Sequence, residues 1–406
     1  MKRVAVRNSG GIASSSQRPR IRRKNGFSDR IDAFGLLSPA KRRLSNQSRQ
    51  SNPEMGACQS EALAVAPESV YATGGPADSR SVLHQLRLKT RVQSFWQNSP
   101  CDSWFTSEKC GTPSFYQTLD EHRYKVHPRL VSAAGIEKTR GKRVLEIGCG
   151  CGSEAERFAR AGASYTAVDL TNAAVSITQR RFQLGGLQGR FAQGDAENLP
   201  FDDGSFDLVY SHGVLHHTPD TPRAIREVHR VLAPGGRAVI MLYYQDSFNY
   251  HVNLRIVRRL RAHLLKTDLG IKLARKIWRE PEEELRRHAE LLRQDPGAYL
   301  DMQNMLNRNT DGPDNPLSQV FSRVSATGLF WQFENVRTEV MFWNPNWLPG
   351  IGKLVPKAIE EWLASRWGWH LWIYGLKSTL EFAAEPVRPQ VRFGINTHFP
   401  SEALVR

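Results

Sequence analysis

The chain has 406 residues, of which 40% are hydrophobic, so it can bury a sizeable core in one decorated domain or in two to three domains. Its formal charge of +16 is concentrated in residues 1–50, where 13 Lys and Arg face two Asp, so the other 356 residues carry only +5. That distribution argues against a folded surface that binds nucleic acid. No apolar run approaches the roughly 18 residues of a membrane span. The cysteines, which have neither disulfide nor zinc spacing and suit a reducing compartment, are Cys58, Cys101, Cys110, Cys149 and Cys151.

Residues 1–80 are rich in Ser, Arg, Gly, Asn and Gln and lack hydrophobic periodicity. They cannot bury enough apolar surface to offset the entropy of ordering, so we predict a disordered basic segment. Its Arg-rich, acid-poor start is similar to a transit peptide, although no continuous apolar face forms between the basic residues. A non-functional extension and a start of translation further downstream are the alternatives.

Residues 81–141 should form a helical cap ahead of the main fold. Leu86 to Trp96 has a helical pattern, and residues 113–128 form a second segment that is aromatic and mixed in charge. The aromatic side chains of this second segment either close over a ligand or only pack a helix onto the domain, and the sequence leaves both possibilities open. These aromatic residues are Phe115, Tyr116 and Tyr124.

The chain is centred on a hydrophobic strand at residues 142–147, which runs directly into three alternating glycines, Gly148, Gly150 and Gly152. Residues 153–162 then begin a helix whose first turn is acidic, as the helix dipole favours. A strand, a glycine turn and a helix start place unpaired backbone N–H groups at the carboxyl edge of a sheet. Such groups can hold the polar part of a nucleotide-like ligand.

A second strand, residues 164–169, ends in Asp169, about 20 residues past the first glycine, where a nucleotide-binding fold places an acid against ribose hydroxyls. A carboxylate there can accept strong hydrogen bonds from both hydroxyls. The continuing alternation of strands and helices predicts a parallel sheet with right-handed crossovers and helices on both faces. The further strands are expected at 189–192, 206–211 and 236–243, and the helices at 171–184 and 221–232.

The pattern Glu146-x-Gly-x-Gly-x-Gly differs from the dinucleotide motif G-x-G-x-x-G, which would need glycine where this chain has Ser153. It closely resembles the first motif of the class I S-adenosylmethionine-dependent methyltransferases. Residues 194–201, Gly-Asp-Ala-Glu-Asn-Leu-Pro-Phe, resemble the adenine-contacting turn of that family. Residues 205–211 resemble its fourth strand, and residues 231–242 resemble its Pro-Gly-Gly turn and fifth strand.

The resemblance implies an α/β fold with a Rossmann-like, doubly wound and mostly parallel sheet of seven strands, in which the last strand is antiparallel. Residues 142–243 would form the core that binds the cofactor S-adenosylmethionine. The residues expected to bind it are Glu146, Gly148, Gly150, Gly152, Asp169, Leu170, Asp195, Ala196, Ser211 and His212.

Methyl transfer from a sulfonium is an in-line displacement, so the protein needs chiefly to align the nucleophile and exclude water. Where the acceptor must lose a proton, histidine is a suitable base because its pKa lies near neutrality. His216 and His217, just past the fourth strand, are the candidate catalytic bases, although His-rich turns at this place in the resembled family are often only structural. Ser211-His-Gly-Val replaces the Asn-Pro-Pro-Tyr motif of enzymes that methylate amino groups of nucleobases or glutamine, which favours a small-molecule acceptor.

Residues 244–330 should form a mostly helical, charged insertion after the fifth strand, which can arch over the carboxyl edge of the sheet as a substrate lid. One amphipathic helix in it is predicted to either pack on its own domain, which we favour, or lie on an anionic membrane. Residues 311–316 are predicted as a turn, and Leu317–Phe330 as a helix. The apolar face of the amphipathic helix would consist of Leu254, Val257, Leu260 and Leu264.

Residues 331–378 should supply two closing strands, at 333–342 and 369–377, followed by a loose tail at 379–406. Six tryptophans surround these strands, and we expect them to form a core beneath the pair rather than an aromatic belt at a membrane surface. They are Trp343, Trp347, Trp362, Trp367, Trp369 and Trp372.

These features predict a cytoplasmic S-adenosylmethionine-dependent methyltransferase that acts on oxygen, carbon or nitrogen of a small-molecule acceptor, with no metal and no nucleic-acid partner. Two alternatives stay open: an RNA methyltransferase, motivated by the net charge, and a non-catalytic partner subunit with a methyltransferase-like fold. The intact glycines and Asp169 argue against the non-catalytic alternative, since a degenerate pocket would tolerate their loss. The acceptor and the oligomeric state stay open.

Overall fold

The computed structural model describes residues 79–101, 106–348 and 352–380. The disorder predicted for residues 1–80 and the tail predicted for residues 379–406 fall almost wholly outside these ranges. Among the helices that the structure describes, none is both long and apolar enough to cross a bilayer.

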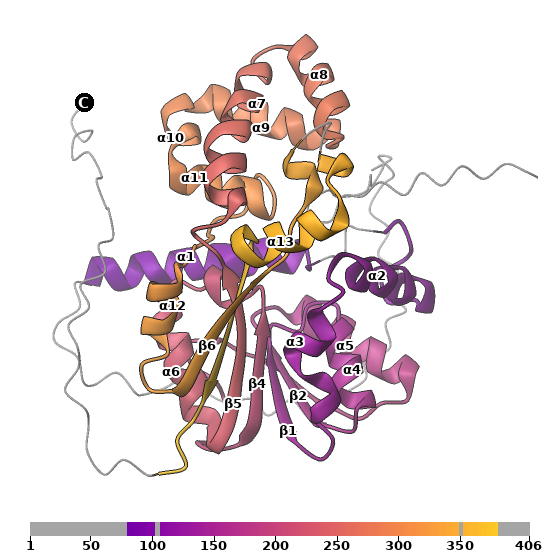
Figure 1. The fold of residues 1–406 in the computed structure, drawn as a ribbon, viewed down its shortest axis with the longest axis vertical. Coiled ribbons are helices and arrows are strands. Elements are labelled where there is room, and N and C mark those ends of the chain that lie inside the picture. The colour runs from indigo at the N-terminus through magenta and orange to yellow at the C-terminus, as the bar shows by residue number, and fades with distance from the viewer. Residues whose placement is uncertain (1–78, 102–105, 349–351, 381–406) are drawn as a thin grey trace, which may run out of the picture. The chain divides into compact units, whose positions relative to one another are not determined.

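A seven-stranded sheet forms the centre of the described chain, with the strand order β3-β2-β1-β4-β5-β7-β6 (Figure 1). Strands β1 to β5 pair in parallel, whereas β7 runs antiparallel to both of its neighbours, β5 and β6. The predicted Rossmann-like, doubly wound sheet with an antiparallel last strand is therefore confirmed. The strands are β1 Arg143–Ile147, β2 Ser164–Asp169, β3 Arg190–Gln193, β4 Phe206–His212, β5 Leu232–Tyr243, β6 Glu334–Met341 and β7 His370–Leu376.

Helices cover both faces of the sheet. On one face α3, α4 and α5 contribute buried side chains such as Phe158 and Phe182 to a core shared with β1, β2 and β4. On the other face α6 and α12 contribute Ile225 and Leu329 to a second core. The helices of this part are α1 Ser79–Asn98, α2 Pro113–Val126, α3 Leu130–Ala134, α4 Ser153–Arg160, α5 Asn172–Gly185, α6 Thr221–Val231 and α12 Arg323–Leu329, with the short turns η1 Ile136–Lys138 and η2 Leu215–His217.

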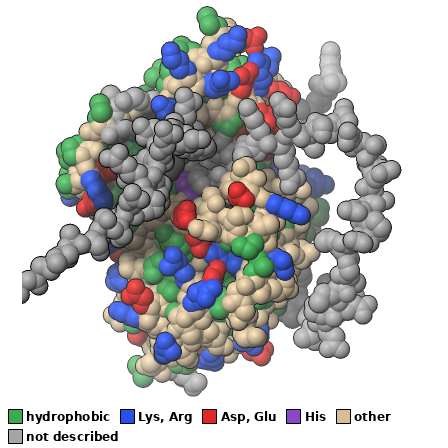
Figure 2. All heavy atoms as spheres, turned by 90° about the vertical axis from the view of Figure 1, so that its right-hand side faces the viewer, with side chains coloured by type: hydrophobic (Ala, Val, Ile, Leu, Met, Phe, Trp, Pro, Cys, Tyr) green, Lys and Arg blue, Asp and Glu red, His purple; other side chains and the backbone are tan. Residues whose placement is uncertain are grey.

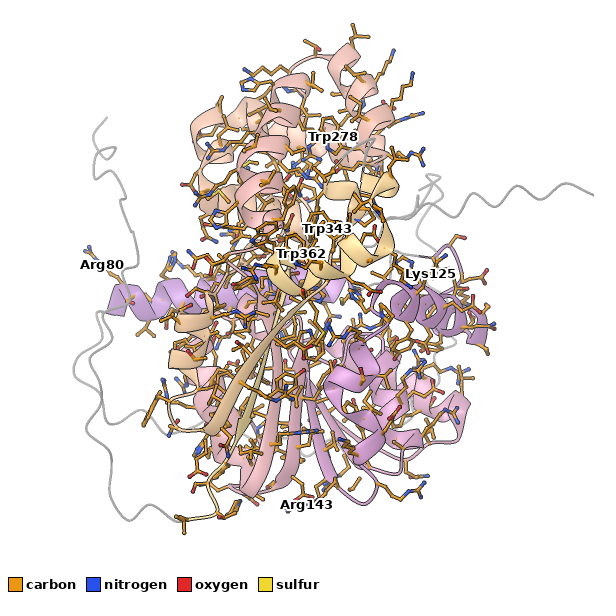
Figure 3. The ribbon with its side chains drawn as sticks, in the orientation of Figure 1. Arg80, Lys125, Arg143, Trp278, Trp343 and Trp362 are labelled. Atoms are coloured by element: carbon orange, nitrogen blue, oxygen red, sulfur yellow. The ribbon has the colours of Figure 1, made fainter. Side chains whose placement is uncertain are left out.

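Between β5 and β6 the chain forms a helical insertion beyond the carboxyl ends of the parallel strands (Figure 1). Arg143, the first residue of β1, marks the opposite edge of the sheet (Figure 3). The insertion has a small core of its own, which includes Ile271, Leu285 and Met305. Its elements are the π-helix η3 Asn249–Val257 and the helices α7 Arg258–Leu264, α8 Asp268–Trp278, α9 Glu282–Gln294, α10 Pro296–Leu300 and α11 Met302–Thr310.

The amphipathic face predicted for Leu254 to Leu264 is wrong. Leu254 is buried, but Leu260 is 62% exposed and Arg261 is only 1% exposed. The π-helical segment η3 precedes α7, and its wider turns shift the side chains that follow away from the 3.6-residue period on which the prediction rested. Arg261 tolerates burial because it pairs with Glu280.

The helix predicted for Leu317–Phe330 is also too long, because only α12, Arg323–Leu329, is helical. Ahead of α12 the chain returns to the sheet: the Gln319 N–H donates to the carbonyl of His216, and Phe321 pairs with Tyr244. These backbone bonds to distant partners replace the helical ones.

The tryptophans form the expected core only in part. Trp362 and Trp367 are 52% and 43% exposed, because they lie on α13 Lys357–Trp367, a surface helix that the sequence analysis did not predict and that carries no buried residue (Figure 3). The short turns η4 Pro345–Trp347 and η5 Gly352–Leu354 precede it. The buried tryptophans are Trp343, Trp347, Trp369 and Trp372.

Candidate functional site

A cavity of about 1080 Å³, partly open to solvent, lies at the carboxyl ends of β1, β2 and β4. Its walls are the glycine turn after β1, the end of β2, the turn after β3 and the turn after β4, and α1 and α2 close its sides. Figure 2 shows a histidine in the recess between the insertion and the part of the chain that carries the sheet.

The glycine turn needs glycine for two separate reasons. Gly148 and Gly152 have φ angles of 81° and 79°, a left-handed conformation that side chains disfavour. A Cβ on Gly148 would also lie 2.2 Å from Cγ2 of Val214, and one on Gly152 would lie 2.9 Å from Cγ2 of Thr178. The backbone of the turn can therefore run along the cavity with no side chain in between.

Asp169 directs its carboxylate towards this turn. Its Oδ1 accepts hydrogen bonds from the backbone N–H (2.9 Å) and the hydroxyl (2.8 Å) of Thr171, and its Oδ2 accepts a longer one from the Gly150 N–H (3.4 Å). Burial raises the pKa of Asp169, and these donors oppose that rise. A fixed acceptor thus lines the cavity at the end of β2.

Two further carboxylates stand at the glycine turn. Glu146 accepts a hydrogen bond from the hydroxyl of Tyr165 (2.5 Å), and burial, together with the nearby Glu154, raises its pKa well above the usual value. Glu154 forms a two-point pair with Arg123 of α2, in which Nε donates to Oε1 (2.8 Å) and Nη2 donates to Oε2 (2.6 Å). Arg123 therefore lines the cavity as a cation held in a fixed orientation.

Helix α1 covers the end of the cavity beside the turn after β3. Lys89 Nζ lies 2.5 Å from both Asp195 Oδ2 and Glu197 Oε2, and Val92 and Trp96 supply apolar wall. The sequence predicted this helix but not its position, because nothing in its own pattern indicates which distant residues it will contact.

The aromatic residues of α2 pack rather than close over the cavity. Phe115 and Tyr116 form a small core with Cys151, and the Tyr116 hydroxyl donates to the Ile177 carbonyl. Tyr124 stays outside the cavity wall, to which α2 contributes Leu119 and Arg123 instead. Of the two possibilities that the sequence left open, the structure therefore shows the packing one.

The charged residues make the cavity acidic. Five carboxylates line it against two cationic side chains, Lys89 and Arg123. Such a site attracts a ligand with net positive charge. The carboxylates are Glu146, Glu154, Asp169, Asp195 and Glu197.

The structure brings most of the residues singled out from the sequence to this one cavity, but not Ser211 and His216. The Ser211 hydroxyl donates to the carbonyl of Ile147 within the sheet (2.9 Å). His216 packs against the ring of Tyr243, with ring centroids 3.7 Å apart. The singled-out residues that line the cavity are Glu146, Gly148, Gly150, Gly152, Asp169, Leu170, Asp195, Ala196, His212 and His217.

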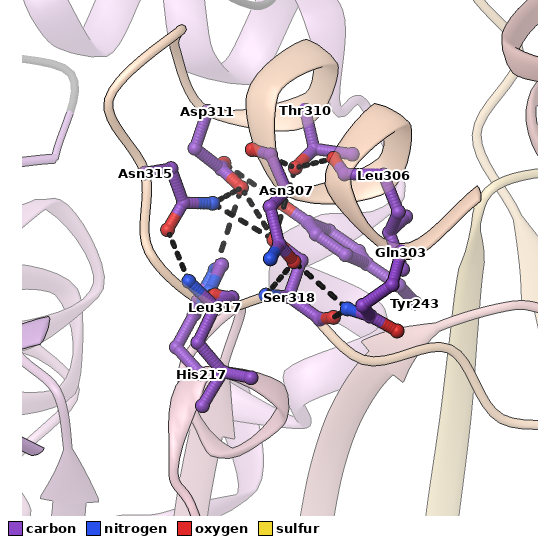
Figure 4. A network of polar contacts seen from close by, with 10 residues as sticks. All are labelled: His217, Tyr243, Gln303, Leu306, Asn307, Thr310, Asp311, Asn315, Leu317 and Ser318. Atoms are coloured by element: carbon purple, nitrogen blue, oxygen red, sulfur yellow. Dashed lines mark hydrogen bonds and ion pairs between the residues drawn. The ribbon is translucent and has the colours of Figure 1, made fainter. Parts of the chain in front are cut away.

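His217 belongs to a polar network that joins the cavity to the insertion (Figure 4). Its Nδ1 donates to the carbonyl of Leu317 (2.6 Å), so Nε2 is the basic nitrogen of the neutral ring, and this atom lies 3.5 Å from Oδ2 of Asp311. Asp311 also accepts a hydrogen bond from the Tyr243 hydroxyl (2.8 Å). Leu317 and Asp311 therefore fix the orientation of the His217 ring from both of its nitrogens.

His212 presents different chemistry. Arg123 Nη2 lies 3.4 Å from its Nδ1, and because a guanidinium only donates, the remaining proton of the neutral ring is on Nε2. That Nε2 is buried and has no hydrogen-bond partner among the residues that the structure describes. Burial, and then the charge of Arg123, lowers the pKa of His212 well below the usual value, so the ring stays neutral and can donate a hydrogen bond.

No group of three or more His, Cys, Asp or Glu in the described part of the chain is arranged to hold a metal ion. The polar groups that line the cavity include five carboxylates, two cations and two histidines.

Residues 145–240 match the family model described as a methyltransferase domain. A phthiotriol/phenolphthiotriol dimycocerosates methyltransferase of Mycobacterium leprae is 51% identical over 98 residues, which are 24% of this chain and 36% of that protein. A fatty-acid O-methyltransferase of Mycolicibacterium smegmatis is 43% identical over 120 residues, 29% of this chain and 42% of that protein. The chain thus matches less than half the length of these relatives. The residues that the family model matches include the glycine turn and Asp169.

Among solved structures, the magnesium protoporphyrin IX methyltransferase of Synechocystis with bound SAH is similar over 71% of this chain and 100% of that chain, with 14% identity and a TM-score of 0.42.

Proposed function

We propose that this chain, which carries a class I S-adenosylmethionine-dependent methyltransferase domain at residues 145–240, transfers the methyl group of that cofactor to a small, largely apolar acceptor. One observation carries the proposal: the glycine turn and Asp169 meet at a single cavity that is acidic. S-adenosylmethionine has two positive groups and one carboxylate, so it fits a cavity with five carboxylates and two cations.

The residues present fit the parts of the cofactor. Asp169 would accept hydrogen bonds from the ribose hydroxyls, and the turn from Asp195 to Glu197 would hold the adenine. The backbone of the glycine turn would face the methionine part, and Arg123, which also pairs with Glu154, would attract the carboxylate of that part. The cofactor supplies an electrophilic methyl group, and the chain supplies alignment and exclusion of water.

The acceptor would enter on the side lined by Trp96, Val214 and His217. Of the two candidate bases, His217 has the better position, because it lines the cavity whereas His216 does not. The names of the relatives, one of which specifies a fatty acid, support an apolar acceptor that is methylated on oxygen.

Calorimetric titration with S-adenosylmethionine tests the cofactor site. Asp169→Asn keeps the shape of the side chain but removes the charged acceptor, so it should weaken binding roughly tenfold to a hundredfold. Asp207→Asn is the matched control, because Asp207 pairs with Arg143 at the opposite edge of the sheet. Absence of binding by the wild-type chain, or equal affinities of the two variants, would refute the assignment.

Transfer of labelled methyl groups from the cofactor to fatty acids and to apolar alcohols tests the acceptor. Labelled ester or ether products that depend on the wild-type chain are the expected result. Labelling of RNA alone would replace the proposal with the RNA methyltransferase alternative.

A further inference from the structure

A second cavity of about 710 Å³ lies between the helical insertion and the residues that follow β6. Trp278 of α8 lines it from the insertion, and Trp347 and Trp369 line it from the other side. Figure 3 shows Trp278 among the helices of the insertion, with Trp343 nearer the sheet. The residues proposed to hold the cofactor are absent from its walls.

Three arginines line this cavity, Arg258, Arg261 and Arg308. Arg258 and Arg261 share one carboxylate, that of Glu280, and Arg261 is 1% exposed. Arg308 is half-buried and has no ion-pair partner among the residues that the structure describes. Two carboxylates, Glu280 and Glu284, line the cavity with these three arginines, which leaves an excess of one positive charge.

The unsatisfied polar atoms at this cavity are all donors. Nε of Arg258, Nε of Arg261 and Nε1 of Trp278 are buried without a hydrogen-bond partner in the described chain. A buried N–H without an acceptor costs free energy, and nearly all such groups in folded proteins are paired with protein, water or a ligand. An acceptor-rich group would satisfy them.

The pKa values of His288 and Arg258 are both lowered, first by burial and then by neighbouring arginines. Burial, followed by the charges of Arg261, Arg258 and Arg308, lowers the pKa of His288 well below its usual value. Burial also lowers the pKa of Arg258, although Glu280 opposes that shift. Both directions follow chiefly from burial, which disfavours the charged form of each group, and the neighbouring arginines add to the effect.

We propose that this second cavity binds an oxyanion, a carboxylate or a phosphate group, through Arg308 together with the Arg258–Arg261 pair. Arginine suits this role because its planar guanidinium presents several N–H donors that match the oxygens of both groups. A buried ion pair that served structure alone would leave neither a free arginine nor unpaired N–H groups at an open cavity.

A series of contacting side chains links the two cavities. Trp369 lines the second cavity and stacks on Tyr243, with ring centroids 4.4 Å apart. The Tyr243 hydroxyl donates a hydrogen bond to Asp311, and Asp311 faces His217 at the first cavity. Asn309, Thr310 and Gly312, on either side of Asp311, line the second cavity. An anion bound there would thus lie behind the residues that orient His217, and not at the position of methyl transfer.

Calorimetric titration of the full chain with inorganic phosphate, and separately with octanoate, tests the proposal. We expect one of the two probes to bind and Arg308→Gln to weaken that binding roughly tenfold. Arg308→Lys, which keeps the charge, should retain part of the affinity. Arg226→Gln, on the exposed face of α6, removes one positive charge elsewhere and should leave the affinity unchanged.

Binding of phosphate alone would identify a phosphate group as the ligand, and binding of octanoate alone a carboxylate on an apolar chain. No binding of either probe would overturn the proposal, as would equal effects of Arg308→Gln and Arg226→Gln. The same variants should bind S-adenosylmethionine like the wild-type chain, so failure of this proposal leaves the proposed methyltransferase activity untouched. Thermal unfolding of each variant confirms that it is folded.

Discussion

Lowering the pH from 7 to 5 should destabilise the folded chain through the clustered rings of His127, His212 and His370. His370 is 4% exposed and lies between two rings, 4.5 Å from Phe342 and 5.1 Å from His127 between centroids. Burial, and then the charge of Arg123, lowers its pKa to about 3. The pKa values of the other two histidines are also lowered, chiefly by burial.

The sign follows from proton uptake. Near pH 7 His370 is neutral in both the folded and the unfolded chain, so it contributes almost nothing to the pH dependence of stability. Below its unfolded pKa of about 6.5 the unfolded chain binds a proton that the folded chain does not, so stability falls as the pH falls, until the folded pKa is reached. With a folded pKa of about 3, the loss between pH 7 and pH 5 is about 2 kcal/mol for this one group.

Urea unfolding followed by circular dichroism at the two pH values measures this loss. His370→Phe keeps an aromatic ring against Phe342 but cannot take up a proton, so its loss of stability on acidification should be about 2 kcal/mol smaller than that of the wild-type chain. The control His263→Phe removes an exposed histidine, which water solvates in both states, and should behave like the wild type. If His370→Phe and the wild type lost the same free energy, the reasoning would be refuted.

Two further predictions concern the cavity at the glycine turn. Gly148→Ala should lower the free energy of unfolding by about 2–5 kcal/mol, measured by chemical denaturation. About 1–2 kcal/mol comes from forcing alanine into the left-handed backbone conformation, and about 1–3 kcal/mol comes from overpacking against Val214. Combining Val214→Ala with Gly148→Ala should recover part of the stability lost to overpacking. If the double variant were no more stable than Gly148→Ala alone, the overpacking against Val214 would be refuted. His217→Asn should lower kcat roughly 10²- to 10⁴-fold with cofactor affinity unchanged by calorimetry, and an unaltered kcat would exclude His217 as the base.

The sequence alone determined the sheet and the centre of the candidate site. The strand before Gly148, the glycines and the helix after them are local patterns, and the alternation of strands and helices leaves few topologies open. For the same reason Asp169 could be placed beside the glycine turn: the carboxyl ends of neighbouring parallel strands meet at one edge of the sheet. The antiparallel direction of the last strand was predicted from the resemblance, and the order β5-β7-β6 was not predicted.

The tertiary structure decided which distant residues complete the site. Lys89 and Trp96 lie on α1, and the sequence of that helix does not indicate which part of the chain it contacts. Arg123 lines the cavity because of the way α2 packs, which the sequence does not show either. His217 gained its orientation from Leu317 and Asp311, residues of the segment that returns from the insertion.

The second cavity could not be predicted at all. From the sequence alone Arg261 is expected to be exposed to solvent. It is buried because the π-helical segment η3 before α7 turns it inward and because Glu280, on a following segment, pairs with it. Local patterns report the period and chemistry of one element at a time. The burial and pairing of charges depend on how several elements pack together, and no local sequence pattern encodes that packing.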